Sequence, residues 1–153
     1  MEREKPCREV SDEPESLFRQ QFTIIGGDFN NAGRASSRLR NILKQLGIPP
    51  LIIRRVATAA YEAEMNVVLY ARRAVLSLLV TPEKITIVAE DEGPGIADIG
   101  LAMQEGYSTA SSEIREMGFG AGMGLPNIHK NADELEINSQ VGIGTTVRFS
   151  VKI

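Results

Sequence analysis

The sequence contains few cysteine, histidine or aromatic residues. Its 153 residues include one cysteine, Cys7, one histidine, no tryptophan and only 5% aromatic residues. A single cysteine excludes an internal disulfide, so the chain does not depend on an oxidising compartment and a cytoplasmic location is expected. We interpret Cys7 as a passive residue of the N-terminal tail, the alternative being a reactive thiol.

Long apolar runs and long basic runs are also missing. No apolar run approaches the roughly 20 residues that cross a bilayer, and no apolar stretch follows the N-terminal charges, so neither a membrane span nor a secretory signal is expected. The formal net charge is −3. Direct nucleic-acid binding is not expected either, because phosphate neutralisation needs clustered Lys and Arg. The remaining composition, 42% hydrophobic and 24% charged, is that of an ordinary globular domain.

The chain divides into a short arm and one domain. Half of the first twenty residues are charged, and Pro6 and Pro14 interrupt any helix. Residues 1–19 are therefore predicted to form a polar, flexible N-terminal arm, and residues 20–153 a single domain.

Hydrophobic periodicity within residues 20–153 predicts an alternation of strands and helices. Strands are expected at 22–25, 75–80, 84–90, 134–138 and 146–153. Helices are expected from Asn30 or Asn31 to about 46, then at 49–70, 98–105 and 126–132. The serine-rich segment 106–118 is expected to be mobile, as part of a lid that covers about residues 99–119. The fold class that follows is an α/β two-layer sandwich, with helices covering one face of a mostly antiparallel sheet.

Glu62 and Asn66 form the first chemical motif. They are four residues apart on a predicted helix, so their side chains project side by side. A carboxylate there can accept a proton from an attacking hydroxyl, and an amide oxygen is a suitable ligand for Mg²⁺. Glu64 is expected to point to solvent, roughly 200° around the helix. The alternative is a solvated pair on an amphipathic helix.

Asp91 begins the second motif, Asp-Glu-Gly-Pro-Gly, directly after a predicted strand. Gly93 and Gly95 permit backbone angles and close approaches that a Cβ would block. A buried carboxylate at this point is able to accept a hydrogen bond from an amine such as adenine N6. The alternative is an ordinary turn.

Glycines before a helix and before a strand form the third and fourth motifs. Gly120, Gly122 and Gly124 alternate ahead of a predicted helix, where backbone N–H groups and the helix N-terminus favour phosphate. A flexible hinge is the alternative. Gly142-Ile-Gly144-Thr145 precedes the last strand and is compatible either with a nucleotide contact by Thr145 or with a plain hairpin turn.

The four motifs occur in the order typical of one superfamily. ExxxN on a helix, DxGxG after a strand, GxGxG before a helix and GxGT before a strand together resemble the GHKL ATPases, over about residues 20–153. The flanking sequence is similar to that of the serine protein kinases that act as bacterial anti-sigma regulatory factors, and especially to the switch kinases. This similarity is carried by ATAAYEAEMNVVLYA (57–71), AEDEGPGIADI (89–99), GYSTA (106–110) and GFGAGMGLP (118–126).

The resemblance implies a Bergerat sandwich that binds ATP and Mg²⁺. By the same resemblance, Glu62 is the catalytic base and Asn66 the Mg²⁺ ligand. Asp91 is expected to hold the adenine, in a pocket shaped by Gly93 and Gly95.

The resemblance also assigns the remaining glycine loops. Gly120, Gly122 and Gly124 are expected to approach the phosphates, and Thr145 to assist near the adenine. The stretch 111–117 makes the serine-rich lid longer than that of a switch kinase.

The implied function is ATP-dependent phosphorylation of a serine or threonine on an anti-sigma-factor antagonist-like protein, with a sigma factor as a further partner. A second hypothesis is an ATP-gated binding module that sequesters a sigma factor or activates a phosphatase without essential kinase activity. Plain ATP hydrolysis is a third. The oligomeric state stays open, a homodimer included.

Overall fold

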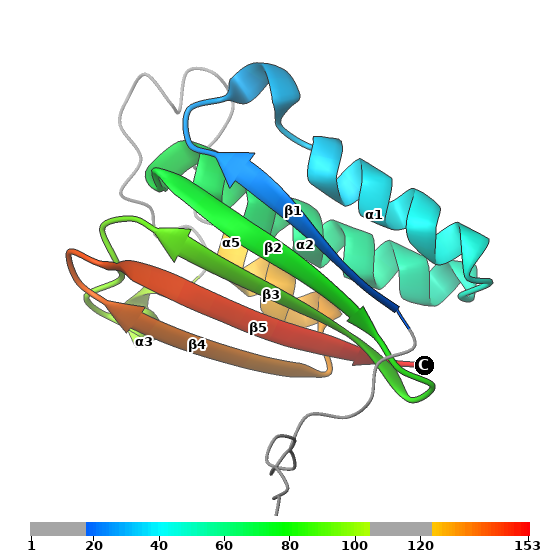
Figure 1. Ribbon diagram of the computed structural model, residues 1–153. Coiled ribbons are helices and arrows are strands. Elements are labelled where there is room, and N and C mark those ends of the chain that lie inside the picture. Colours follow the sequence, from blue (N-terminus) through cyan, green and yellow to red (C-terminus); the bar gives the residue numbers. More distant parts are fainter. Residues whose placement is uncertain (1–17, 105–123) are drawn as a thin grey trace, which may run out of the picture.

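One layer of strands packs against one layer of helices in the computed structural model, which describes residues 18–104 and 124–153 (Figure 1). The five strands form one sheet in the order β1-β2-β3-β5-β4, and every neighbouring pair is antiparallel. They are β1 (Phe18–Ile25), β2 (Arg73–Val80), β3 (Lys84–Glu92), β4 (Glu134–Gln140) and β5 (Gly144–Lys152). Each strand pair is in register along its length, which fixes which side chains face the helices.

The helices cover one face of this sheet (Figure 1). They are α1 (Arg34–Gln45), α2 (Pro50–Tyr70) and α5 (Gly124–Asn131), with a short α3 (Ile99–Ala102) and a 3₁₀ turn η2 (Phe29–Asn31) in the connections. None of the described helices is both long enough and apolar enough to span a bilayer. The predicted α/β two-layer sandwich is confirmed.

The core lies between the sheet and the helices, and it follows from strand alternation. Leu76, Ile87 and Phe149 from the three central strands point toward the helical layer and are buried. Val56 and Ala60 on α2 meet them and are fully buried. Small residues on α2 let this long helix lie close to the sheet, which makes α2 the central element of the helical layer.

Several element boundaries differ from the prediction. β1 begins at Phe18, inside the arm predicted for 1–19, and the rest of that arm lies outside the described residues. α1 begins at Arg34 rather than after Asn31: Gly33 is the N-cap of α1, and the Asn31 side chain donates instead to Asp28, the residue before η2. Of the predicted lid, residues 105–119 lie outside the described residues, and residues 99–102 form α3.

The N-terminus of α1 is capped by a side chain from another helix. Glu64 of α2 accepts hydrogen bonds from the backbone N–H groups of Gly33, Ala35 and Ser36 at 2.9, 3.1 and 3.0 Å. The first turn of any helix leaves such N–H groups without partners and carries a partial positive charge. A carboxylate satisfies both requirements, so α1 and α2 are locked together at this point.

The expectation that Glu64 points to solvent is therefore wrong. The side chain does face away from Glu62, as its position on the helix requires, but it is only 2% exposed. The error has a physical cause: α2 lies between α1 and α5 (Figure 1), so the side of α2 opposite Glu62 faces another helix and not water. Helical periodicity gives the direction of a side chain but not what occupies that direction.

We expect Glu64→Gln to destabilise the fold by roughly 1–3 kcal/mol, because the new amide turns an N–H donor toward the backbone donors of α1. Urea unfolding monitored by circular dichroism measures this difference. Glu83→Gln, an exposed carboxylate in the β2–β3 turn, is the matched control and should leave the unfolding midpoint unchanged. Equal stability of the two variants would contradict the capping role.

Candidate functional site

Glu62 and Asn66 lie on the side of α2 that faces α5. Asn127 of α5 donates from Nδ2 to Glu62 Oε2 at 3.1 Å, which fixes one carboxylate oxygen. Partial burial raises the pKa of Glu62 above its usual value, and the hydrogen bond from Asn127 lowers it in part. A half-buried carboxylate with a raised pKa is a better proton acceptor near neutral pH than a solvated one.

Asn66 lies directly against the first residue of α5. A Cβ added at Gly124 would stand 3.0 Å from Asn66 Oδ1, so glycine at this position leaves room around the amide oxygen. The Asn66 side chain is half-buried and makes no hydrogen bond to any of the described residues. A partly buried amide oxygen that accepts no hydrogen bond from the described residues fits a hard cation.

The surroundings of Asn66 suit Mg²⁺ rather than a protein-caged metal. No group of three His, Cys, Asp or Glu side chains in the described part of the chain is placed to hold a metal ion. Mg²⁺ usually keeps several waters and takes few protein ligands together with substrate phosphates. Asn66 fits that pattern as a single protein ligand.

Asp91 lies near the end of β3, where β5 begins beside it. Its Oδ1 accepts the backbone N–H of Thr145 at 3.0 Å, which orients the carboxylate. Burial raises the pKa of Asp91, and the bond from Thr145 lowers it in part. Oδ2 accepts no hydrogen bond from the described residues, so one oxygen remains available for a donor on a ligand.

The glycines after Asp91 bring the loop against its neighbours. Gly95 has φ +77°, and a Cβ there would stand 2.5 Å from the carbonyl oxygen of Gln140, so only glycine fits without rearrangement. A Cβ at Gly93 would meet Ala71 Cβ at 3.1 Å and Asp91 Oδ1 at 3.2 Å. Close approach at both positions fixes the loop on the β4–β5 turn and keeps it beside Asp91.

The end of α2 connects the two halves of the site. Glu62, Asn66 and Gly124 form one group, while Asp91, Gly93, Gly95 and Thr145 form the other. Ala71, which contacts the second group, follows Asn66 by five residues, or about 8 Å along a helix axis. Gly120 and Gly122, predicted to approach phosphates, lie outside the described residues.

Two polar residues of the site were not predicted. Asn127 contacts Glu62, and it is the first polar residue after the Gly-Leu-Pro that opens α5. Ser139 lies within 2.8 Å of the Thr145 hydroxyl and accepts the N–H of Ile96 at 2.7 Å, so it joins the turn to the loop. The hairpin between β4 and β5 could have indicated Ser139, because its register pairs Ser139 with Thr145.

Comparison with known proteins finds a matching domain family and several similar proteins. Residues 28–151 match the histidine kinase-like ATPase domain family. The serine/threonine-protein kinase RsbT of Bacillus subtilis is 34% identical over 113 residues, which span 71% of this chain and 79% of that protein. The anti-sigma F factors of Caldanaerobacter subterraneus subsp. tengcongensis and Thermoanaerobacter sp. (strain X514) are each 36% identical over 100 residues, 62% of this chain and 66% of theirs.

We expect Asn127→Ala to raise the pKa of Glu62 further, because it removes the hydrogen bond that stabilises the ionised form while the burial remains. Carboxyl-detected NMR titration of Glu62 measures this shift. Asn138→Ala, an exposed amide on β4, is the control and should leave the titration of Glu62 unchanged. A lowered pKa of Glu62 in Asn127→Ala would show that water, and not burial, dominates its surroundings.

Proposed function

The chain belongs to the histidine kinase-like ATPase domain family, and on that basis we propose that it is an ATP-dependent serine/threonine protein kinase that acts as an anti-sigma regulatory factor. The names of its relatives support this: one is a serine/threonine-protein kinase and others are anti-sigma F factors. The observation that carries the proposal is the group of Glu62, Asn66 and Gly124. It combines a half-buried carboxylate, an amide oxygen that accepts no hydrogen bond within 18–104 and 124–153, and a glycine that leaves space beside them.

Glu62 would be the general base of phosphoryl transfer. Its carboxylate would accept the proton of the attacking serine or threonine hydroxyl, and the hydrogen bond from Asn127 would hold it in position. The raised pKa brings its proton affinity closer to the working pH. Most of the remaining rate enhancement in such reactions comes from positioning and from neutralising phosphate charge.

Asn66 would be the protein ligand of Mg²⁺. When bound, the ion supplies positive charge beside the phosphates. Gly124 and the N-terminus of α5 would present backbone N–H groups near the same phosphates. Because Asn66 and Glu62 are four residues apart on α2, the helix itself sets the base and the metal ligand at a fixed separation.

Asp91 would recognise the adenine. Thr145 orients Oδ1, and Oδ2 would accept a hydrogen bond from the exocyclic amine. Gly93 and Gly95 would form the wall of this pocket. A nucleobase that presents a carbonyl at that position, such as guanine, would place acceptor against acceptor, which predicts preference for ATP over GTP.

For the protein substrate we propose a small anti-sigma-factor antagonist-like protein, with a sigma factor as a second partner. The second candidate function is an ATP-gated binding module that sequesters a sigma factor or activates a phosphatase. The name anti-sigma F factor, which two relatives carry, supports its sigma-factor part. The kinase and the binding module differ in one testable respect: the binding module would still bind its partner in response to ATP when Glu62 cannot act as a base.

Glu62→Gln should slow phosphoryl transfer by roughly 10²–10⁴-fold while nucleotide affinity changes little. The assay incubates the protein with Mg-ATP and candidate partners encoded beside its gene, and reads one added phosphoryl group by intact mass. Glu83→Gln is the control. Full transfer by Glu62→Gln would exclude it as the base, whereas ATP-dependent partner capture with no transfer by wild type would favour the binding module.

Stability separates a chemical role of Glu62 from a folding defect. The pKa of Glu62 is higher in the folded than in the unfolded chain. Its contribution to stability is therefore fully present below the unfolded pKa and is lost as the pH rises through the folded pKa, above which its charge opposes folding. Glu62→Gln removes that charge and should not lower the thermal midpoint at neutral pH. Lost transfer with an unchanged or higher midpoint identifies a chemical role.

Asp91→Asn should weaken ATP binding by roughly tenfold to a hundredfold, because an amide in place of Oδ2 sets a donor against the adenine amine. Isothermal titration calorimetry with ATP measures the loss. GTP is the matched ligand control, and its affinity should not fall, since the substitution removes no favourable contact to guanine. Equal losses for both nucleotides would indicate a structural role for Asp91 instead.

A further inference from the structure

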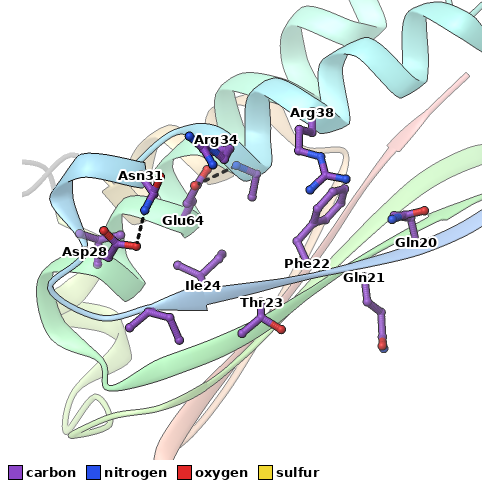
Figure 2. A pocket seen from close by; sticks show the side chains of 13 residues that line it. Gln20, Gln21, Phe22, Thr23, Ile24, Asp28, Asn31, Arg34, Arg38 and Glu64 are labelled. Atoms are coloured by element: carbon purple, nitrogen blue, oxygen red, sulfur yellow. Dashed lines mark hydrogen bonds between the residues drawn. The ribbon is translucent and has the colours of Figure 1, made fainter.

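A groove follows the outer edge of β1, away from the candidate nucleotide site. It encloses about 370 Å³ and is lined by every residue from Gln20 to Ile25, with α1 along its other side (Figure 2). On α2 it reaches Glu64 and Val68, not Glu62 or Asn66. The groove therefore lies on the opposite side of α2 from the residues assigned to phosphoryl transfer.

β1 is an edge strand whose residues 20–25 lack the charged residues and proline that often protect such an edge. It pairs only with β2 in the described part of the chain, so the N–H and C=O groups on its outer side have no strand partner. Natural edge strands are commonly protected by charged residues, proline or bulges. Residues 20–25, Gln-Gln-Phe-Thr-Ile-Ile, contain neither charge nor proline, and their register with β2 is unbroken. This edge is competent to pair with another strand.

The wall opposite this edge is basic. α1, Arg-Ala-Ser-Ser-Arg-Leu-Arg-Asn-Ile-Leu-Lys-Gln, has no acidic residue. Arg34 and Arg38 are one turn apart and line the groove, and the Arg38 guanidinium lies over the Phe22 ring, 5.5 Å from its centroid (Figure 2). Neither arginine forms an ion pair with a described residue.

The groove contains two carboxylates, and both already have hydrogen-bond donors. Glu64 accepts three backbone N–H groups from the start of α1. Asp28, at the end of the groove beyond Ile25, accepts from Asn31 at 2.8 Å. The positive charge of Arg34 and Arg38 is therefore not compensated by an ion pair in the described part of the chain.

We propose that this groove binds an extended segment of a partner protein, which adds to β1 as a sixth strand and carries carboxylates at alternate positions. Backbone pairing along the open edge supplies the affinity, as in other cases of strand addition. Alternate side chains of a strand are about 6.6 Å apart on one face, and residues four apart on a helix rise by about 6 Å. Two carboxylates at alternate positions therefore match Arg34 and Arg38.

A second copy of this chain is a poorer occupant. Pairing β1 with β1 of another copy about a twofold axis would place both α1 helices on the same side of the joined sheet. The two α1 helices, each with basic residues and no acidic one, would then approach one another across the seam, and like charges opposed in this way are unfavourable. Charge complementarity favours an acidic strand from a different protein.

The test uses the 153-residue chain without nucleotide, so its outcome does not depend on the kinase proposal. The probe is an acetylated and amidated peptide in which threonine and glutamate alternate over seven residues. Backbone amide NMR should show saturable shifts at Gln20–Ile25 and Arg34–Arg38. A peptide with lysine in place of glutamate, and one with alternate backbone nitrogens methylated, are the controls and should not bind.

Paired variants separate the charge from the fold. The double variant Arg34→Gln with Arg38→Gln should bind the acidic peptide roughly tenfold more weakly, since two ion pairs are lost. Arg40→Gln changes a charge on the same helix that does not line the groove and should bind like wild type.

Three results would overturn the proposal. One is binding of the acidic peptide with shifts outside the groove, and a second is equal binding by the double arginine variant. The third is a groove already occupied in the free protein, either by a second copy, seen as a dimer in sedimentation, or by residues 1–17, seen as cross-peaks to β1.

Discussion

The buried carboxylate of Glu64 determines how the helical layer is assembled. It accepts three backbone N–H groups from the first turn of α1, and it comes from α2, the helix that also carries Glu62 and Asn66. A polar group buried away from water is tolerated only when its hydrogen bonds are satisfied. Because α1 and α2 satisfy one another here, neither helix is free to rotate without exposing unpaired donors.

Because of this constraint, α2 is the helix that contacts all the other main parts of the fold: α1, the sheet and α5. One side packs on α1 through Glu64, another meets the sheet through Val56 and Ala60, and a third presents Glu62 and Asn66 toward α5. The groove beside β1 and the group assigned to phosphoryl transfer therefore occupy opposite sides of the same helix. A strand bound in the groove would contact the surroundings of Glu64 without touching the nucleotide.

In the group around Asp91, close approach between backbone segments holds the structure in place, as the buried Glu64 does between α1 and α2. Gly95 adopts a positive φ against the β4–β5 turn, and Asp91 is oriented by the backbone of Thr145, so the loop and the turn fix one another. The match to the histidine kinase-like ATPase domain, over residues 28–151, covers both halves. The family is thus established, while the roles of the individual residues stay predictions.

The sequence alone determined the fold class, the strand order along the chain and the motifs that identify the family, because these depend on local periodicity and on glycine and carboxylate spacing. It also gave the correct relation between Glu62 and Asn66, which helical geometry fixes within one element. Only the tertiary structure decided the surroundings of Glu64, the partner Asn127 and the start of α1 at Arg34. Each of these depends on contact between elements distant in the chain, and a helix's own periodicity does not specify whether water or another helix lies against a given side.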